Sequence, residues 1–202
     1  MTRVHAAVVI PVKAFRDAKR RLAPVLSPAE RVRLARALAT RVVAAAGELP
    51  VTIVCDDEAV RTWATSVGAA ALWTPGLGLD GAVEAGVDHV GRAGAARAIV
   101  AHADLPLARD LSVLTGRSGV LVVPDRHTDG TNVISIPTDV GFRFGYGPGS
   151  FRRHRAEATR LGLPVEVHAD PELNWDVDVP ADLAVPGGLD LLGDLDLPAD
   201  VR

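Results

Sequence analysis

Short, continuous apolar runs alternate with helix-like segments through the first half of the chain, and this alternation limits the folds that it can adopt. Such runs are too short for helices and predict buried strands. Strands that are separated by helices form a mostly parallel sheet with helices on both faces. The sequence therefore predicts an α/β fold, with its first strands at residues 4–10, 51–54, 69–72 and 97–101.

The helices between these strands carry start and stop signals. Ser27 can cap a helix whose first position is a proline, Glu30 completes a capping box, and Gly47 ends the helix. Residues 57–66 predict a second helix. A glycine loop at residues 76–80 precedes a third helix, which we expect to run to about residue 90.

The second half of the chain predicts three further strands and one helix. No repeat and no linker interrupts the 202 residues, so we expect one large domain at residues 1–185. Residues 186–202 are rich in Gly, Leu and Asp and are expected to form a tail that ends in a short, weak helix and carries no chemistry. The expected elements are strands at residues 120–123, 132–136 and 165–168 and a helix at residues 150–161.

The composition excludes several classes of function. A formal net charge of −3 argues against nucleic acid or an anionic membrane as the main partner. Cys55 is the only cysteine, which excludes an intrachain disulfide and a cysteine metal cluster. No apolar run approaches the ~20 residues that a membrane-spanning helix needs. Together these features predict a cytoplasmic protein.

Basic residues gather in the loop after the first strand. Lys13, Lys19 and Arg21 all fall within nine consecutive positions. The carboxyl end of the first strand is where α/β sheets bind phosphates, so this loop is a candidate phosphate site. A solvated basic helix is the alternative that the sequence leaves open.

Two acidic motifs lie far apart in the chain. Asp104 directly follows the strand at residues 97–101 and precedes a proline turn. Asp176 and Asp178 alternate, so their side chains face the same side of an extended segment. Mg²⁺ commonly binds one or two carboxylates together with substrate phosphates, which makes these aspartates candidate metal ligands. Helix-capping or turn aspartates are the alternative for both motifs.

Two turn-rich clusters, residues 125–132 and 145–150, flank the strand at residues 132–136. The second cluster contains Gly147 and ends at Ser150, where a helix is expected to begin. Glycines let backbone N–H groups approach a ligand closely, and a helix start offers unpaired N–H groups to an anion. The clusters therefore predict a pocket for a small, highly anionic molecule, with ordinary surface loops as the alternative.

Several common catalytic signatures do not occur in the sequence. No glycine loop is followed by Lys-Ser or Lys-Thr, which excludes a Walker motif. There is no G-x-S-x-G nucleophile motif, and the six histidines lack paired metal-ligand spacing. These observations argue against P-loop, serine-hydrolase and zinc chemistry.

Seven short motifs stand in one order along the chain. They are IPVK at residues 10–13, AKRRL at 18–22, ADLP at 103–106, PDR at 124–126, DGTN at 129–132, YGPGSF at 146–151 and DVDVP at 176–180. Together they resemble the 2-phospho-L-lactate guanylyltransferase family, which includes the phosphoenolpyruvate guanylyltransferases of coenzyme F-420 biosynthesis. The resemblance extends over about residues 4–185. The GTN and YGPGSF segments are specific, whereas the acidic motifs alone occur across nucleotidyltransferases.

The resemblance implies a single-domain fold of the nucleotidyltransferase type, which is also that of the nucleotide-diphospho-sugar transferases. It implies Mg²⁺ as the cofactor and Lys13 and Asp104 as catalytic residues. Asp80 stands where members of the family often have Asn. The implied contacts are Lys13, Lys19, Arg21 and Asp80 with the nucleotide, Asp104, Asp176 and Asp178 with the metal, and Thr131, Gly147 and Ser150 with the acceptor.

The implied reaction joins GMP from GTP to a small phosphorylated three-carbon acid and releases pyrophosphate. A phosphate monoester is largely dianionic at neutral pH, because its second pKa is about 6, so attack on the α-phosphorus requires no general base. The site must instead bring two anions together. Metal ions, cationic side chains and backbone N–H groups do this in phosphoryl transfer.

Several alternatives stay open at this point. The acceptor could be phosphoenolpyruvate, 2-phospho-L-lactate or 3-phosphoglycerate. A related nucleotidyltransferase acting on a molybdopterin or sugar phosphate is disfavoured, because such enzymes usually carry a glycine-rich loop where this chain has PVKAF. A catalytically silent nucleotide-binding regulator is disfavoured by the three aspartates. A homodimer and hand-over of the product to the next pathway enzyme are further hypotheses.

Overall fold

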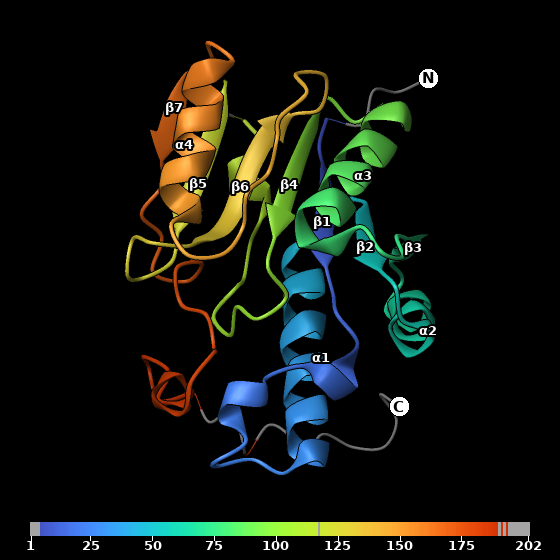
Figure 1. Ribbon diagram of the computed structural model, residues 1–202, viewed down its shortest axis with the longest axis vertical. Helices are drawn as coiled ribbons and strands as arrows, with labels where there is room; N and C mark the ends of the chain where they lie inside the picture. The colour runs from blue at the N-terminus through green and yellow to red at the C-terminus, as the bar shows by residue number, and fades with distance from the viewer. Residues whose placement is uncertain (1–4, 117, 190, 192, 194–202) are drawn as a thin grey trace.

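The computed structural model describes residues 5–116, 118–189, 191 and 193. Residue 4 of the first expected strand and the helix expected at the end of the tail lie outside these residues. The described residues build a seven-stranded sheet with helices packed against it (Figure 1). In sheet order the strands are β3 (Ala70–Trp73), β2 (Val51–Cys55), β1 (Ala7–Pro11), β4 (Arg97–Ala101), β6 (Thr131–Pro137), β5 (Val120–Pro124) and β7 (Val165–Val167).

Most neighbouring strands run parallel, which confirms the predicted mostly parallel sheet. β1 is parallel to β2 and β4, β2 to β3, and β5 to β7. β6 is reversed and pairs antiparallel with both β4 and β5. The short turn between β5 and β6 cannot make a crossover, so β6 returns as a hairpin. The start of β6 therefore lies at the same edge of the sheet as the carboxyl ends of β1 and β4.

Helices cover both faces of the sheet (Figure 1). The α-helices are α1 (Pro28–Ala45), α2 (Glu58–Ser66), α3 (Gly78–Arg92) and α4 (Ser150–Arg160). α1 and α2 share a core with Val8 and Ile10 of β1, whereas α3 and α4 share the opposite core with Ala7 and Val9. This alternation along β1 confirms the predicted two-sided arrangement. No helix among the described residues is long and apolar enough to span a membrane.

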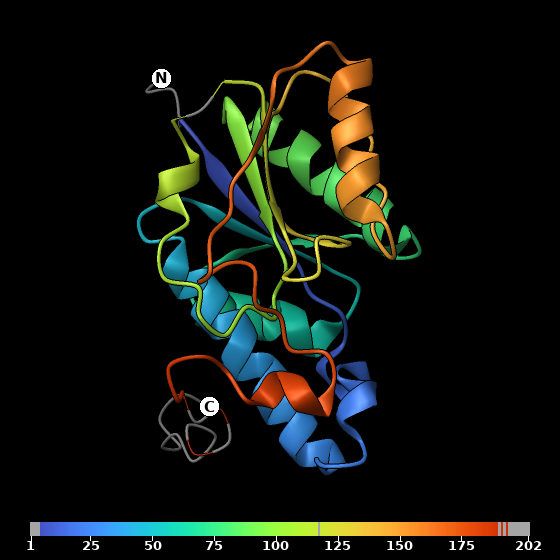
Figure 2. The same cartoon turned by 90° about the vertical axis from the view of Figure 1, so that its left-hand side faces the viewer.

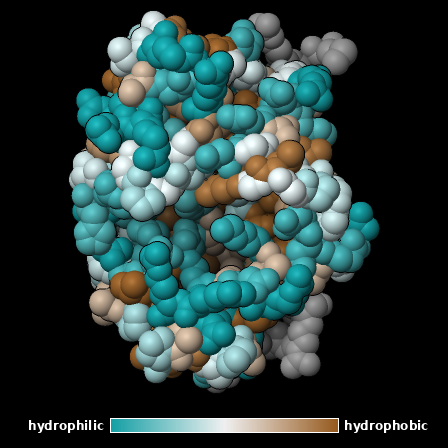
Figure 3. All heavy atoms as spheres, in the orientation of Figure 1, coloured by the Kyte–Doolittle hydropathy of each residue, from teal (hydrophilic) through white to brown (hydrophobic). Residues whose placement is uncertain are grey.

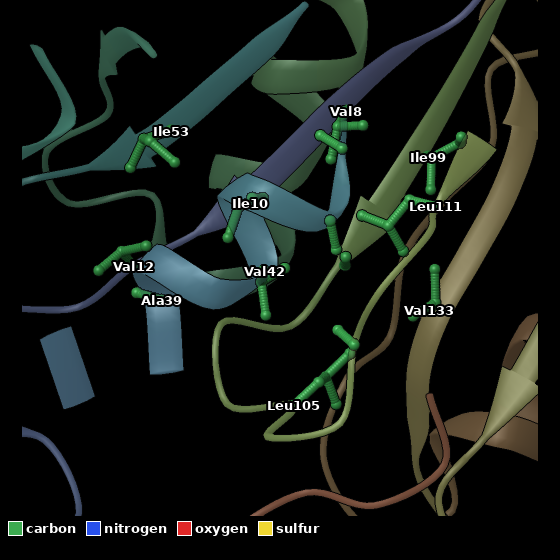
Figure 4. Close-up of a cluster of buried hydrophobic side chains, with 14 of the residues drawn as sticks. Val8, Ile10, Val12, Ala39, Val42, Ile53, Ile99, Leu105, Leu111 and Val133 are labelled. Carbon is green, nitrogen blue, oxygen red and sulfur yellow. The ribbon is translucent and has the colours of Figure 1, made fainter. Parts of the chain in front are cut away.

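Figure 4 shows the core on the α1 side of the sheet. Ile10, Ile53 and Ile99 come from three adjacent strands and are fully buried with Val42 of α1. Leu105, from the loop after β4, belongs to the same cluster. Burying one such side chain contributes about 1.5–3 kcal/mol. Leu105 therefore anchors the loop that carries the first acidic motif.

The helices begin where the sequence predicts, except for α3. The capping box is present, since Glu30 N–H donates to Ser27 Oγ at 3.3 Å and Ser27 N–H donates to the Glu30 carboxylate at 2.7 Å. The third helix, expected to follow the glycine loop at residues 76–80, begins inside that loop at Gly78. Asp80 therefore lies in the first turn of α3, where the helix dipole favours a carboxylate.

A smaller apolar cluster ties both ends of the chain to α1. Leu22 and Leu26 follow β1, Leu34 belongs to α1, and Val177 and Val185 come from the C-terminal segment. Figure 2 shows both segments beside the lower part of α1. The cluster brings the basic loop and the second acidic motif to the same end of the molecule.

Candidate active site

Lys19 lies where three distant segments of the chain meet. Its ammonium donates to Asp104 Oδ2 at 2.6 Å and to the carbonyl oxygen of Val177 at 2.6 Å, and it lies 3.4 Å from Asp178 Oδ1. Its side chain is only 10% exposed. Burial alone would lower the pKa of Lys19, but Asp104 and Asp178 raise it above its ordinary value. The charged lysine therefore joins the two acidic motifs.

The path of the basic loop explains how Lys19 reaches the carboxylates. Two short 3-10 turns, Phe15–Asp17 and Arg20–Leu22, enclose Lys19, whose φ of 53° is left-handed. Leu22 is fully buried and anchors the second turn. We predicted from the sequence that Lys19 contacts nucleotide phosphates. In this structure its ammonium is paired with carboxylates instead, and phosphate contact stays a prediction.

Asp104 presents a carboxylate oxygen that no other group uses. Its Oδ2 binds Lys19, whereas Oδ1 is buried and has no hydrogen-bond partner among the described residues. Burial disfavours the charged form, but Lys19 and His102 lower the pKa of Asp104 below its ordinary value. A buried, ionised and unpaired oxygen is a group that a bound cation would satisfy.

Asp176 and Asp178 complete the acidic group. Burial, together with the negative charges of Asp104 and Asp178, raises the pKa of Asp176 to about 6. The backbone of this segment is also tied to the first motif, because Val177 N–H donates to the carbonyl oxygen of Asp104 at 3.2 Å. The structure therefore brings the three predicted metal ligands into one neighbourhood.

The three aspartates suit Mg²⁺ in chemistry, although they are not arranged around a metal position. No three carboxylate, imidazole or thiol groups among the described residues form a ready metal site. In this arrangement the Lys19 ammonium supplies the positive charge between Asp104 and Asp178. Mg²⁺ prefers oxygen ligands and usually takes only one or two carboxylates from the protein, with water and substrate phosphates completing its shell, so Mg²⁺ at these aspartates stays a prediction.

Arg126 and Asp182 position the second acidic motif, a role that no sequence pattern predicted for either residue. Arg126 forms an ion pair with Asp182, donates to the carbonyl oxygen of Asp176 at 3.1 Å and stacks 4.4 Å from the ring centre of Trp175. Asp182 is 2% exposed and accepts the N–H of Asp178 at 2.6 Å. These contacts fix the backbone that carries the two aspartates. Arg126 belongs to the PDR motif at residues 124–126, but this motif does not indicate that Asp182 is the partner of the arginine.

A hollow of about 420 Å³ opens beside these charges, at the carboxyl ends of β1 and β4. Lys13, Lys19 and Arg21 line it from the basic loop, and Asp104 and Asp178 line it from the acidic motifs. Figure 3 shows this face of the molecule hollowed near its middle and rimmed by hydrophilic side chains. The volume is in the range of small-molecule sites. Candidate phosphate-binding and metal-binding residues therefore share one hollow.

Arg153 of α4 holds the glycine-rich loop that precedes this helix. Its guanidinium donates, over 2.7–3.2 Å, to four successive carbonyl oxygens, those of Gly145, Tyr146, Gly147 and Pro148. A guanidinium has five N–H donors in a rigid fork, so one arginine can hold a whole turn. The sequence showed only a basic helix here, and this role was missed.

Most N–H groups of the same loop already have acceptors. Four of these N–H groups donate to side chains: Phe144 to Glu84, Gly145 to His154, Tyr146 to Asp80 and Gly149 to Asp129. Ser150 and Phe151, the first two residues of α4, donate to the carbonyl oxygens of Gly147 and Asp129. The expectation of a free N–H group at Ser150 is therefore wrong. Within residues 143–151, all of them described, Gly147 alone has an N–H group without an acceptor.

His154 joins the two turn clusters. Its Nε2 accepts the N–H of Gly145 at 3.2 Å, and its Nδ1 lies 3.0 Å from Thr131 Oγ1. Because Nε2 accepts, the neutral ring carries its proton on Nδ1 and donates it to Thr131. Burial and the neighbouring His102 lower the pKa of His154 to about 4. Thr131, a candidate acceptor contact, is 3% exposed and is held by this histidine.

We expect His154 to make the stability of the protein depend on pH. The unfolded chain protonates this histidine near pH 6.5, whereas the folded protein resists protonation until about pH 4. The free energy of unfolding is therefore unaffected by this histidine above about pH 6.5. Between about pH 6.5 and pH 4 it falls, by on the order of 3 kcal/mol in total, because the unfolded chain binds a proton that the folded protein does not. Chemical denaturation at about pH 7 and pH 4 measures this loss. A His154→Gln protein should lose less, and an equal loss in both proteins would contradict the assignment.

Three rings connect the acidic group to the glycine-rich loop. His102, Tyr146 and His154 follow one another with ring centres 5.0 and 4.9 Å apart. His102 lies two residues before Asp104, so the column runs from the loop after β4 to α4. Asp80 braces it, because its Oδ1 accepts the N–H of Tyr146 at 2.8 Å. Asp80 therefore holds the loop, and its nucleotide contact stays a prediction.

The candidate acceptor residues lie at the same edge of the sheet as the aspartates. β6 begins at Thr131, and His102 N–H donates to the carbonyl oxygen of Asn132 at 2.9 Å, which ties β6 to the end of β4. The 420 Å³ hollow is not lined by Thr131, Gly147 or Ser150. The two turn clusters are in contact, as the sequence predicts, but the acceptor roles of these residues stay predictions.

Proteins of known name match most of the chain. The model of the family described as Guanylyl transferase CofC like matches residues 6–186. A phosphoenolpyruvate guanylyltransferase of Sphaerobacter thermophilus is 36% identical over 182 residues, which cover 86% of this chain and 88% of that protein. A 2-phospho-L-lactate guanylyltransferase of Methanothermobacter thermautotrophicus is 35% identical over 184 residues, which cover 87% of this chain and 81% of that protein.

Solved structures share the fold at low sequence identity. One assigned as a nucleotide-diphospho-sugar transferase of Desulfovibrio desulfuricans G20 gives a TM-score of 0.73 at 17% identity and covers 90% of this chain and 85% of its own. CMP:2-keto-3-deoxy-manno-octonic acid synthetase in complex with CTP gives a TM-score of 0.58 at 15% identity. The match covers 88% of this chain and 95% of that chain. These matches confirm the predicted nucleotidyltransferase fold.

Proposed function

This chain belongs to the CofC-like family of guanylyl transferases, and from that membership we propose that it joins GMP from GTP to a small phosphorylated three-carbon acid. As a member of the family it is a nucleotidyltransferase. GTP as the donor, release of pyrophosphate and a place in coenzyme F-420 biosynthesis are the proposed parts. The observation that carries the proposal is the meeting of Lys19, Asp104 and Asp178 at the hollow lined by Lys13 and Arg21.

In the proposed reaction an oxygen of the acceptor phosphate attacks the α-phosphorus of GTP. The bond from the α-phosphorus to the bridging oxygen of pyrophosphate breaks, and a new phosphoanhydride forms. The acceptor phosphate is largely dianionic at neutral pH, so no side chain has to remove a proton. The site has to align the two anions and neutralise them.

Cationic side chains of the hollow are proposed to neutralise the triphosphate. Arg21 is 75% exposed and lies 3.7 Å from Asp178, so its guanidinium is available to a ligand. Lys13 lines the same hollow. Lys19 has a flexible four-carbon stem, which allows its ammonium to turn from the carboxylates to a phosphate. Mg²⁺ held by the three aspartates would neutralise the charge on the reacting phosphates.

We propose that the acceptor's anionic groups bind at Gly147. Its N–H is the unpaired one of the glycine-rich loop, and Ser150 N–H donates to the Gly147 carbonyl oxygen at 3.0 Å. Thr131 and Ser150 are almost fully buried. Thr131 supports the loop from inside through its hydroxyl contact with His154, and Ser150 supports it through its backbone N–H, while the backbone at Gly147 faces the acceptor.

An assay with GTP, Mg²⁺ and each of three acceptors tests the function. We expect pyrophosphate release, and a product with the mass of GMP plus the acid, with phosphoenolpyruvate or 2-phospho-L-lactate. 3-Phosphoglycerate is the third acceptor. Product formation with an unrelated phosphate only would indicate another nucleotidyltransferase. GTP binding without turnover on any acceptor would indicate a silent nucleotide-binding regulator.

The location and the partners of the enzyme are also proposals. A phosphoanhydride product is activated for group transfer, so hand-over to a following transferase in the cytoplasm suits its chemistry. A homodimer is the proposed assembly. Light scattering during size-exclusion chromatography tests the dimer, and co-purification with the following transferase tests the hand-over.

An Arg21→Ala protein should show a KM for GTP raised about fivefold and an unchanged KM for the acceptor. An exposed arginine that contacts a phosphate contributes about 1 kcal/mol, which corresponds to this change. Arg33→Ala, on the exposed side of α1, is the matched control. Thermal melting should accompany the kinetics, because long basic side chains also cover apolar surface. An unchanged KM for GTP in a normally melting Arg21→Ala protein would remove Arg21 from the phosphate site.

A further inference from the structure

A second hollow of about 400 Å³ adjoins the first and has no part in the reaction described so far. The two hollows share Pro11, Val12 and Lys13 at the end of β1. From there the second hollow extends to the end of β2 and the start of α3. A ligand with phosphates in the first hollow can therefore continue into the second.

We propose that the second hollow binds the base of the nucleotide and that Asp56 selects guanine there. This inference rests on the proposed guanylyl transfer and deepens it, because it assigns the residue that distinguishes GTP from other nucleoside triphosphates. Asp56 directly follows β2 and lines the hollow.

The walls of the second hollow suit a flat aromatic ring. Val12 and Val54 from the two strand ends and Ala82 from α3 are buried apolar residues. Leu79, in the first turn of α3, lines both hollows. A nucleobase has apolar faces and a polar edge, so apolar walls can hold it while one polar group reads its edge.

Asp56 is the carboxylate of this hollow that is free to read such an edge. Asp57 forms an ion pair with Arg16 and caps α2, and Asp17 forms an ion pair with Arg20. Asp56 is exposed and makes no hydrogen bond or ion pair with any residue that the structure describes. A side chain that holds no part of the fold and points to solvent beside a hollow is available to a ligand.

The chemistry of a carboxylate singles out guanine among the common bases. An ionised carboxylate only accepts hydrogen bonds and can accept two of them side by side. Guanine presents two adjacent donors, N1–H and the 2-amino group, on its Watson–Crick edge. Adenine presents an unprotonated N1 at that edge, which a carboxylate repels. A site built on hydrogen bonds to a substrate strongly rejects an analogue that lacks them.

Calorimetric titration with GTP, ITP and XTP tests the proposal independently of turnover. ITP lacks the 2-amino group, so the parent protein should bind it about 10- to 100-fold more weakly than GTP, as expected for one hydrogen bond to a charged acceptor. XTP carries a carbonyl group in place of the 2-amino group. An Asp56→Asn side chain can accept from N1–H and donate to this carbonyl. The Asp56→Asn protein should therefore prefer XTP to GTP.

Glu58→Gln is the matched control, because it makes the same chemical change on α2, outside the hollow. It should keep the preference of the parent for GTP. Affinities for GTP and XTP are compared within each protein. A general loss of stability would weaken both and therefore could not reverse the preference between them. Equal binding of GTP and ITP by the parent, or a preference for GTP retained by Asp56→Asn, would overturn the proposal. Selective GTP binding without turnover would overturn the proposed transfer and leave the base site standing.

Discussion

An Asp104→Asn protein should lose turnover by about 10³-fold or more. Asn matches the size of Asp but carries no charge, so the buried and unpaired Oδ1 no longer offers an anionic ligand to a metal ion. Lys19 also loses its closest carboxylate, which lies 2.6 Å away. A 10³-fold loss corresponds to about 4 kcal/mol of transition-state stabilisation, which is within what one metal-ligand charge supplies.

Turnover should be measured at saturating GTP, acceptor and Mg²⁺, with thermal melting alongside. Some loss of stability is expected, because a buried ammonium that loses its partner is costly. Asp88→Asn is the control: Asp88 lies on α3, is 66% exposed and pairs only loosely, at 3.6 Å, with Arg92. Near-parental turnover of the Asp104→Asn protein would show that Asp104 is not essential.

A Gly147→Val protein should bind the acceptor about 10- to 100-fold more weakly and bind GTP normally. Gly147 has φ +91°, a conformation that a β-branched residue adopts only with strain. Nothing lies within 4 Å of the position of an added Cβ, so the effect comes from the backbone rather than from a clash. Relaxing this strain would turn the unpaired N–H away from the acceptor, and one hydrogen bond to an anion accounts for the expected loss.

Gly94→Val separates strain from binding. Gly94 has φ +98° and equally open surroundings, but it precedes β4 and therefore lies at the opposite edge of the sheet. Both variants should lose similar stability, and only Gly147→Val should lose acceptor affinity. Ser150→Ala should be mild, because the Ser150 backbone N–H supports the loop. Calorimetric titration of phosphoenolpyruvate and 2-phospho-L-lactate with Mg²⁺ present decides the matter. Normal acceptor binding by Gly147→Val would place the acceptor elsewhere.

The sequence determined the architecture, because its signals there are local. Each buried parallel strand is a short apolar run, and the capping box at Ser27 and Glu30 depends on residues three apart. Once the strand at residues 97–101 is predicted, its carboxyl end is known as well. Asp104, which follows it, could therefore be placed at the carboxyl edge of the sheet. The basic loop after β1 follows from the same reasoning.

Tertiary structure decided how these residues are paired. Lys19 reaches Asp104 and Asp178 across 85 and 159 positions, and a lysine near the expected phosphates gives no sign of carboxylate partners. His154 contacts Gly145, nine positions away, and Thr131, which lies 23 positions away and comes within reach only when α4 packs on the sheet. A histidine on a basic helix carries no local signal of such contacts.

The reversal of β6 and the bonding of the glycine-rich loop were likewise decided in three dimensions. The apolar run of β6 does not indicate whether the strand is parallel or antiparallel to its neighbours. The short turn from β5 makes it antiparallel. His154, Asp80 and Asp129 accept the N–H groups of Gly145, Tyr146 and Gly149, whereas no described residue accepts that of Gly147. Sequence patterns specify which residues are available, and long-range packing determines which of their polar groups remain unpaired for a ligand.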